Sequence, residues 1–347
     1  MPALPFKLNQ DRRRHIPRQR HRVTNWPSYD ASLRQRGSLT VWFSDEAIEA
    51  SAAEPRTTRD GQPRYSVLAI LTALTLKAMF RLAHRQTEGL IGSVIGPLGL
   101  ALRVPDHTTL NRRAATLEVP RPSWSSNGAG GEAGPVHLLV DSTGLRLCGA
   151  GEWLAERHGA RTRRSWRKLH LGVDAETGRI VASAPTGREV DDGAQAGPLL
   201  DQVTGALASF TGDGGYDQDR VYDGVAERHP EADVIVAPRA TAVPSDTAET
   251  EPSHSRSVRE AAVGGADRGR RDRHLRLIAE HGRTGWQRAS GYTKRARAEA
   301  AIARWKRVIG DGLRSREDGR RATEVAVAAH ALNRRLALGR PNYVRVA

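Results

Sequence analysis

Short apolar runs in the middle of the chain predict the strands of a sheet. Residues 136–140 (VHLLV) form an apolar run followed by Ser, Thr and Gly, as expected for a buried strand that ends in a turn. Residues 167–174 alternate between polar and apolar side chains, which predicts a half-buried strand. Residues 180–184 return after a turn, so the three segments predict a three-stranded meander.

The segment that follows predicts a helix and two further strands. Apolar residues recur at helical spacing between residues 192 and 208. A fourth strand is expected to end at Asp213, and residues 232–237 (ADVIVA) predict a fifth. Mixed strands covered by helices make this an α/β (α+β) domain, with a mixed sheet flanked by helices.

Helical periodicity dominates the part of the chain that precedes the sheet. It predicts one helix over residues 67–79 and another over residues 87–96. Asp106 is placed to cap a further helix, which carries Arg112 and Arg113. This all-α segment is either a helix-turn-helix that reads DNA or an ordinary bundle of short helices.

Composition and periodicity together divide the chain into five parts. Segments rich in Pro, Gly and Ser are typical of linkers, and basic stretches with few apolar residues are typical of disordered arms and insertions. The predicted parts are a basic, disordered arm (1–30), a helical module (31–119), a linker (120–135), an α/β domain with an irregular insertion at about 240–273 (136–320), and a C-terminal helix and tail (321–347).

Four residues near the end of the α/β domain carry candidate chemistry. Tyr292, Arg295, Glu299 and Lys306 are spaced so that their side chains fall along one stripe of a helix. A carboxylate in a row with two cations and a phenol suits phosphodiester chemistry, since the carboxylate can anchor a divalent cation while the cations hold phosphate. The same stripe is also typical of a solvated helix with an Arg295–Glu299 ion pair.

Two aspartates follow predicted strands. Asp141 comes directly after the first apolar run, and Asp213 stands between glycines, where a ligand can approach the backbone closely. Each also has a structural alternative, because Asp141 could form an Asx turn and Asp213 an ordinary Asp-Gly turn.

A basic stretch around Trp166 is a second candidate for contact with a polyanion. Residues 161–168 (RTRRSWRK) combine cations with an aromatic ring, which can hold phosphates while it stacks on a base or sugar. A solvated surface is the alternative. The candidate contacts in this stretch are Arg163, Arg164, Trp166 and Lys168.

Charge and composition point to polyanionic partners. The 347 residues carry a formal net charge of +15, and the sequence pI is about 10.9. The single cysteine, Cys148, excludes a disulfide framework and a thiolate zinc cluster. The basic N-terminus lacks the apolar segment of a signal peptide, and no Walker-type phosphate loop is present. We therefore expect neither a membrane association nor a nucleotide cofactor.

These residues together resemble the DDE-type transposases of bacterial insertion sequences, in the group with a Tyr-x2-Arg-x3-Glu-x6-Lys signature. All four signature positions match, and the likeness extends from about residue 35 onward. Two features depart from the family's pattern: the segment at about 251–270, and Gly215, where many relatives carry alanine. The matching segments are VDSTGL (140–145), RKLHLGVDAETGRIVA (167–182), GDGGYD (212–217), GWQRASGY (285–292) and IGDGLRSR (309–316).

The resemblance implies a ribonuclease-H-like catalytic domain and gives roles to the candidate residues. Asp141, Asp213 and Glu299 correspond to the catalytic acids that bind two Mg²⁺ ions, with Mn²⁺ as a substitute. We expect Tyr292, Arg295 and Lys306 to position DNA or phosphate. The helical module becomes a DNA-binding module, and the expected DNA contacts are Arg112, Arg113, Arg163, Arg164, Trp166 and Lys168.

The expected function is that of a DNA transposase in the bacterial cytoplasm, acting on the nucleoid. Such an enzyme binds the double-stranded ends of its element, cuts phosphodiester bonds and joins the freed 3′-hydroxyl to target DNA. Pairing two ends implies a homodimer or a higher oligomer in the DNA complex. Two alternatives stay open: a catalytically inactive DNA-binding relative, and a stand-alone ribonuclease-H-like nuclease.

Overall fold

A computed structural model of the chain describes residues 20–38, 48–55, 57, 62–100, 102–120, 134–147, 166–244 and 266–346. The chain forms two compact units. The larger unit is Trp42–Arg334, and the smaller unit combines Met1–Val41 with Arg335–Ala347.

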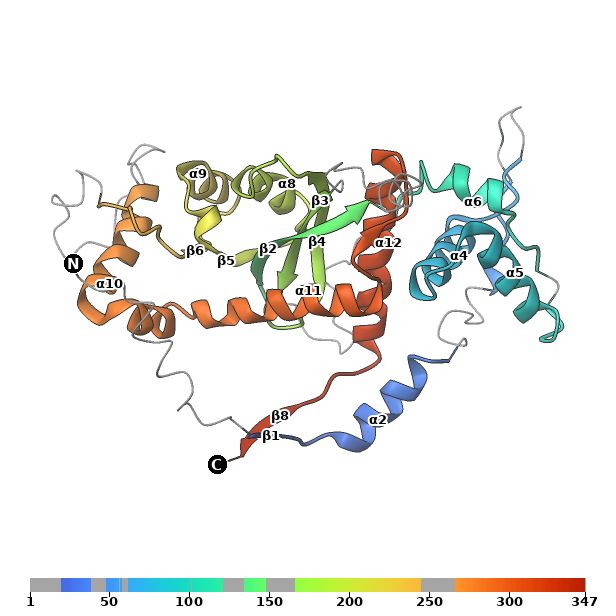
Figure 1. Cartoon of the computed structure of the whole chain (residues 1–347), viewed down its shortest axis with the longest axis horizontal. Helices are drawn as coiled ribbons and strands as arrows, with labels where there is room; N and C mark the ends of the chain where they lie inside the picture. The colour runs from blue at the N-terminus through green and yellow to red at the C-terminus, as the bar shows by residue number, and fades with distance from the viewer. Residues whose placement is uncertain are drawn as a thin grey trace, which may run out of the picture. The chain divides into compact units, whose positions relative to one another are not determined.

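A mixed sheet lies at the centre of the larger unit (Figure 1). β2 pairs antiparallel with β3, and β3 with β4, whereas β5 runs parallel to β2 and β6 parallel to β5. Three antiparallel strands are followed by two parallel ones, so the expected α/β class with a mixed sheet is confirmed. The order across the sheet is β4 (Ile180–Gly187), β3 (Trp166–Asp174), β2 (Val136–Leu147), β5 (Leu207–Gly212) and β6 (Asp233–Val236), with β7 (Gly312–Leu313) also paired to β2.

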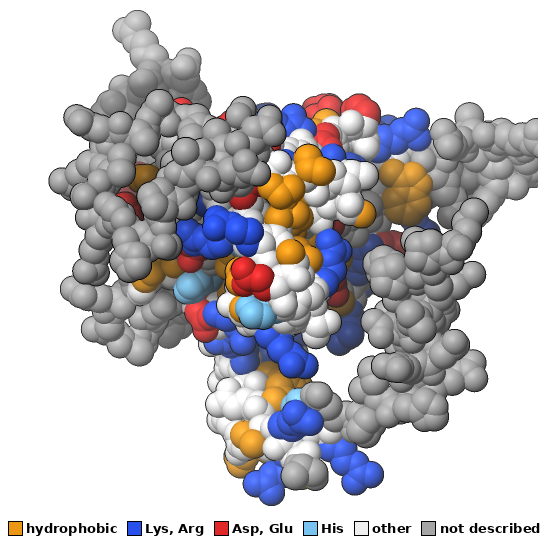
Figure 2. Space-filling view, turned by 90° about the vertical axis from the view of Figure 1, so that its left-hand side faces the viewer, with side chains coloured by type: hydrophobic (Ala, Val, Ile, Leu, Met, Phe, Trp, Pro, Cys, Tyr) orange, Lys and Arg blue, Asp and Glu red, His pale blue; other side chains and the backbone are white. Residues whose placement is uncertain are grey.

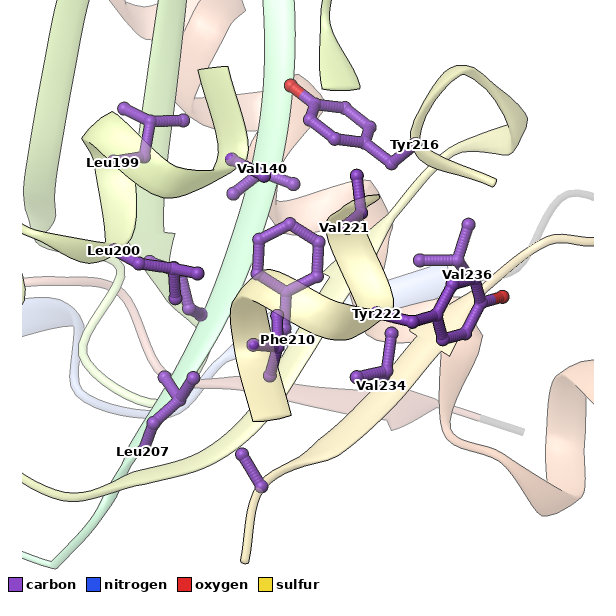
Figure 3. Close-up of a cluster of buried hydrophobic side chains, with 14 of the residues drawn as sticks. Val140, Leu199, Leu200, Leu207, Phe210, Tyr216, Val221, Tyr222, Val234 and Val236 are labelled. Carbon is purple, nitrogen blue, oxygen red and sulfur yellow. The ribbon is translucent and has the colours of Figure 1, made fainter. Parts of the chain in front are cut away.

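Helices cover both faces of this sheet. α8 (Ala196–Leu200) and α9 (Asp219–Arg228) pack on one face, and α11 (Ala296–Val308) and α12 (Asp318–Ala337) pack on the other (Figure 1). Figure 3 shows the first of these cores, in which the Phe210 ring is surrounded by aliphatic side chains of the strands and of α8 and α9. Burial of apolar area on both faces is what stabilises the sheet.

The second core explains why β3 is more deeply buried than its sequence pattern predicts. Residues 169–174 are all buried, whereas the alternating pattern predicts a half-buried strand. Trp305 of α11 and Leu332 of α12 belong to the core on one face of β3. On the other face, a Cβ at Gly172 would lie 3.0 Å from Leu138 Cδ1, so only glycine fits there without displacing a neighbour.

β2 continues past the point where the sequence predicts a turn. The Ser-Thr-Gly sequence after Asp141 stays extended, because Ser142 pairs with His170 and Gly144 with Lys168 on β3. The prediction that the strand ends at Asp141 is therefore wrong. Asp141 lies instead just beyond Leu139, the last residue of β2 that pairs with β5.

The helix predicted over residues 192–208 is also shorter than expected. It consists of a 3₁₀ turn, η3 (Gly193–Gln195), and α8, and the chain is again a strand from Leu207 onward. Gly205 has a φ of 134°, a conformation that favours glycine and ends the helical pattern. The fifth predicted strand is confirmed as β6.

In the larger unit, α4 (Val67–Met79), α5 (His84–Ile95) and α6 (His107–Arg113) precede the sheet. Asp106 caps α6 as predicted, since its Oδ1 accepts hydrogen bonds from the backbone of Thr108 and Thr109. A DNA-reading role for these helices stays a prediction. The predicted linker falls mostly on residues 121–133, which lie outside the described residues.

The apolarity of α4 and α5 does not make either helix long enough to cross a bilayer. Within the described ranges, no single helix has the length and composition of a membrane span. The two helices reach that composition only as a pair, and the pair is bent by 109°.

α10 (Ala266–Ala289) begins inside the region that was predicted to be an irregular insertion. Residues 266–273 are helical, so the insertion is shorter than expected, and residues 245–265 lie outside the described residues. The helix changes direction at Gly282, where φ is 69°. Trp286 in its second part is fully buried and donates a hydrogen bond to His274 Nδ1 at 2.9 Å.

The smaller unit corrects the prediction of a disordered arm for residues 20–30. β1 (Arg20–Val23) pairs antiparallel with β8 (Tyr343–Val346), and α2 (Trp26–Gln35) follows. Asn25 Nδ2 donates to Arg340 O at 2.8 Å. The partner strand lies at the opposite end of the sequence, so no local pattern could have predicted this pairing. Residues 1–19 lie outside the described residues.

Candidate active site

Parallel pairing of β2 and β5 brings two aspartates to the same level of the sheet. Leu139 of β2 pairs with Thr211 of β5, and Asp141 and Asp213 each follow two residues later. Side chains alternate between the faces of a strand, so Asp141 projects on the same face as Leu139. Leu139 packs against Ala298 of α11, which means that Asp141 also faces that helix.

Asp213 ends β5 and caps the 3₁₀ turn η4 (Gly214–Tyr216). Its Oδ1 accepts a hydrogen bond from Gly215 N at 2.9 Å. A Cβ at position 215 would lie 3.0 Å from the same oxygen, so glycine leaves the carboxylate less crowded. Asp213 is thus a turn former and at the same time points a second oxygen towards α11.

Asp141 does not form the Asx turn that its sequence allows. Its Oδ1 accepts from Ser142 N at 2.9 Å, but the backbone stays extended within β2. The side chain is 13% exposed, compared with 40% for Asp213 and 59% for Glu299. Asp141 is therefore the most enclosed of the three predicted acids.

A single guanidinium joins all three predicted acids. Arg295 Nη2 lies 3.6 Å from Asp141 Oδ2 and 3.8 Å from Asp213 Oδ2. Arg295 Nη1 lies 2.7 Å from Glu299 Oε1, on the first turn of α11. The structure thus brings together residues that are far apart in the sequence, and one positive charge stands among three carboxylates.

Burial and the surplus of negative charge shift the pKa values of the residues in this cluster. Burial raises the pKa of Asp141, the Arg295 charge opposes this effect, and the nearby Asp213 and Glu299 charges add to it. Burial alone would lower the pKa of Arg295, but the charge of Asp141 and the other neighbouring acids raise it. The cluster therefore favours a bound cation.

The donor set fits a hard divalent cation, although the acids surround a guanidinium. Across the described parts of the chain, no group of three or more His, Cys, Asp or Glu side chains is arranged to hold a metal. Carboxylate oxygens are the ligands that Mg²⁺ and Mn²⁺ take in proteins. Arg295 Nε is buried without a hydrogen-bond partner among the described residues, so the guanidinium is incompletely satisfied where it lies. By donor type the three carboxylates suit such ions, while in the arrangement described here Arg295 lies among them.

The helical stripe predicted from the sequence is interrupted at its start. Tyr292–Arg295 forms a 3₁₀ turn, η6, and α11 begins only after it. Gly291 enters this turn with a φ of 71°, and Tyr292 packs on Trp286 with ring centroids 4.9 Å apart. Lys306 is exposed in the last turn of α11 and makes no contact with the three acids among the described residues.

A fourth acid, Asp192, lies next to the site and was not predicted. Ser142 Oγ donates to its Oδ2 at 3.0 Å, and Lys168 Nζ donates to its Oδ1 at 3.0 Å. The Tyr216 hydroxyl is buried without a partner among the described residues. Burial, and then the charges of Asp192 and Asp213, raise the pKa of this phenol. The signal in the sequence is the acid pair at 191–192, shortly after a predicted strand.

The predicted DNA contacts lie in different settings. Lys168 is engaged inside the chain, because it also donates to Val190 O at 2.8 Å, so it is not a free surface cation. Trp166 is half-buried, with the Arg146 guanidinium 5.7 Å from its ring. Arg112 is exposed and Arg113 half-buried in the last turn of α6. Arg163 and Arg164 lie outside the described residues.

Two family models match the chain, and together they span most of it. Residues 132–334 match a family model described as a transposase DDE domain, and residues 34–150 match a second model with the same description. The first match alone covers more than half of the chain. Among solved structures, the chain is similar to a piggyBac transposase in a synaptic complex with hairpin DNA, at 13% identity over 88% of this chain and 81% of that chain. The TM-score is 0.27, which is too low to support an argument from that likeness.

Proposed function

The chain belongs to the DDE transposase family, and on this premise we propose that it cuts DNA at the ends of an insertion sequence and joins the freed 3′-hydroxyl to target DNA. The observation that carries the proposal is the convergence of Asp141, Asp213 and Glu299 on one guanidinium. Three acids that are far apart in the sequence meet around one cation, and such a concentration of carboxylates is typical of a functional site.

Asp141, Asp213 and Glu299 are the residues that would hold two Mg²⁺ ions, or Mn²⁺ in their place. When bound, such ions activate water or a 3′-hydroxyl and stabilise the leaving oxygen of the phosphodiester. The carboxylates differ in exposure, with Asp141 enclosed and Glu299 open to solvent. Asp141 and Asp213 are held by their strands, so we propose that Glu299 is the acid that adjusts.

The remaining residues of the site orient the acids and the DNA. Arg295 neutralises part of the carboxylate charge and would pass to a DNA phosphate when the acids take up cations, because phosphate offers the same kind of oxygen acceptor. Asp192 holds Ser142, the neighbour of Asp141, through a 3.0 Å hydrogen bond. Tyr292 is supported by Trp286 and would present its hydroxyl to the strand that is cut. Lys306 would contact a phosphate further along the strand.

The charge of the chain supports double-stranded DNA as the partner. The formal net charge is +15, and on the face drawn in Figure 2 Lys and Arg side chains gather in several groups among fewer acidic ones. We propose that α4 to α6, with Arg112 and Arg113, contact the element ends. Pairing two ends requires a homodimer or a larger assembly on DNA, and the proposed reaction uses no nucleotide cofactor.

The decisive experiment incubates the purified full chain with DNA that contains element ends and Mg²⁺. Nicks together with joined products support transposition. Nicks without joined products indicate a stand-alone ribonuclease-H-like nuclease, and a shifted but intact DNA band indicates an inactive DNA-binding relative. In the Asp213→Ala variant we expect no cleavage but an unchanged gel shift. Cleavage that persists in this variant would overturn the assignment of the acids.

A further inference from the structure

A cavity of about 50 Å³ lies within the larger unit, where α4, α5 and α6 meet α12 and the segment after β7 (Figure 1). Its lining is unusual in charge, because basic side chains come from two stretches of the chain, 77–84 and 314–320, and one acid lies among them. The charged and titratable lining residues are Lys77, Arg81, His84, Arg314, Arg320 and Glu324. None of them belongs to the acid cluster around Arg295.

The one acid of the cavity is already engaged. Glu324 accepts hydrogen bonds from Arg314 N at 2.9 Å and from Ser315 N at 2.8 Å, which holds the chain after β7 against α12. Four permanent cations line the same space, so the cavity keeps a surplus of positive charge. A concave surface with such a surplus attracts anions.

Two of the basic side chains that line the cavity have no hydrogen-bonded partner in the described part of the chain. Lys77 lies in the last turn of α4 and His84 is the first residue of α5, and neither makes a hydrogen bond or an ion pair with a described residue. Burial lowers the pKa of Lys77. Burial and then the Lys77 charge lower the pKa of His84 to about 4. An anion in the cavity would offset both effects.

The three arginines are held in place by backbone carbonyls, which leaves further N–H groups of each guanidinium available. Arg81 donates to Arg307 O at 2.8 Å, and Arg314 donates to Arg81 O. Arg320 donates to Asn111 O at 3.2 Å, and its Nη1 also pairs with Glu317 Oε1 at 2.6 Å. Arg81 has a φ of 55°, a conformation that a residue other than glycine rarely adopts. The hydrogen bonds to Arg307 O and Val308 O hold the Arg81 side chain at the wall of the cavity.

The size of the cavity suits a tetrahedral oxyanion. A single water needs about 10–15 Å³ of such space, so about 50 Å³ has room for several oxygen-sized groups. Phosphate also matches the fork of donors that arginine presents. The neighbouring helix α6 supplies Asn111 to Arg320, and its last turn carries Arg112 and Arg113. A strand of DNA along α6 would therefore pass this cavity.

We propose that the cavity binds a phosphate group through Lys77 and the surrounding arginines, and that the phosphate belongs to the backbone of bound DNA. The cavity alone supports the binding of a phosphate group. The assignment of this phosphate to DNA rests on the proposed function. The site is separate from the acids that cut DNA, so it serves binding and not the chemical step.

The first arm of the test uses inorganic phosphate and thermal unfolding of the full chain. Lys77→Met keeps the length of the side chain and removes a charge that burial disfavours, so we expect the variant to be at least as stable as the wild type. Low millimolar phosphate should raise the Tm of the wild type relative to chloride at equal ionic strength, and this rise should be lost in Lys77→Met. Arg276→Gln removes one positive charge from an exposed side chain of α10 and should keep the rise.

The second arm measures binding of a fluorescent duplex by anisotropy, without a divalent cation, so that no cleavage occurs. Lys77→Met should weaken binding about tenfold and reduce the slope of log Kd against log salt by about one. Arg276→Gln serves again as the control.

Changes in both arms support a backbone phosphate, while a change only with inorganic phosphate overturns the DNA source. If Lys77→Met behaves like the wild type in both arms, the whole proposal is wrong. An inactive enzyme that still shows both effects would refute the transposase function and leave this site standing.

Discussion

The acid cluster and the basic cavity of the larger unit are built with opposite surpluses of charge. Around Arg295, three carboxylates share one guanidinium. Around Glu324, four permanent cations face one carboxylate. In each cluster, the one opposite charge lowers the free-energy cost of placing the like charges in a partly buried position. It does not neutralise the cluster. We therefore propose that each site is completed by a ligand of the missing sign, a metal cation in the acid cluster and a phosphate in the cavity.

The strongest prediction concerns the enclosed acid. Asp141→Asn preserves the shape of the side chain and removes its charge, so we expect cleavage and joining to be abolished while binding of duplex DNA is kept. A gel-based cleavage assay in Mg²⁺ and in Mn²⁺, together with a gel shift, measures both properties. Ser183→Ala on β4 is a suitable control, since its hydroxyl makes no hydrogen bond within the described part of the chain. Normal cleavage by Asp141→Asn would mean that the acid cluster is structural.

The second prediction concerns pH and the basic cavity. His84 faces Lys77, Glu324, Arg320 and His107, and its pKa of about 4 lies below its ordinary value of 6.5. The unfolded chain therefore binds a proton that the folded chain rejects between these pH values. The free energy of unfolding should be highest above pH 6.5 and should fall by as much as ~3 kcal/mol as the pH drops towards 4.

Urea unfolding in phosphate-free buffer from pH 7.5 to pH 4 tests this dependence. In the His84→Gln variant, the free energy of unfolding should depend less on pH between 6.5 and 4. Added phosphate should also reduce the loss at low pH, because a bound anion favours the protonated ring. An unchanged pH curve in His84→Gln would show that the imidazole is not held neutral by its surroundings.

The third prediction tests whether Arg295 competes with metal ions. Arg295→Gln leaves three carboxylates without a shared cation, so the metal-free chain should lose about 1–2 kcal/mol of stability. For the same reason Mn²⁺ should bind more tightly than to the wild type. Isothermal titration with Mn²⁺ and thermal unfolding with and without the ion measure both effects. Weaker Mn²⁺ binding by the variant would indicate that Arg295 supports the ions and does not oppose them.

The smallest expected effect comes from the single acid of the cavity. Glu324→Gln weakens two hydrogen bonds from backbone amides, which should lower the free energy of unfolding by about 1 kcal/mol. The cavity then carries a larger positive surplus, so phosphate should raise the Tm of this variant more than that of the wild type. An equal phosphate response in the two proteins would show that Glu324 does not oppose anion binding.

Local patterns predicted much of the fold because the elements involved are defined by their own residues. α4 follows from its apolar period, α6 from the Asp106 cap, and β6 from a short apolar run. The failures have a common cause, which is pairing with a distant segment. β2 runs on past Asp141 because β3 offers partners to Ser142 and Gly144, and β1 is ordered only because β8 reaches it from the other end of the chain.

The amino-acid sequence by itself indicated the α/β class and the family, and it predicted Asp141, Asp213 and Glu299 as the acids of the site, because residue types and signature spacing are local properties. Only the tertiary structure decided that Arg295 stands between those acids, that Asp192 lies beside them and that Lys168 points inward. It also decided that basic side chains from two distant stretches of the chain, 77–84 and 314–320, meet around one cavity. Charges act through space, so the partner of a charged side chain is set by how the chain packs and not by its neighbours in the sequence.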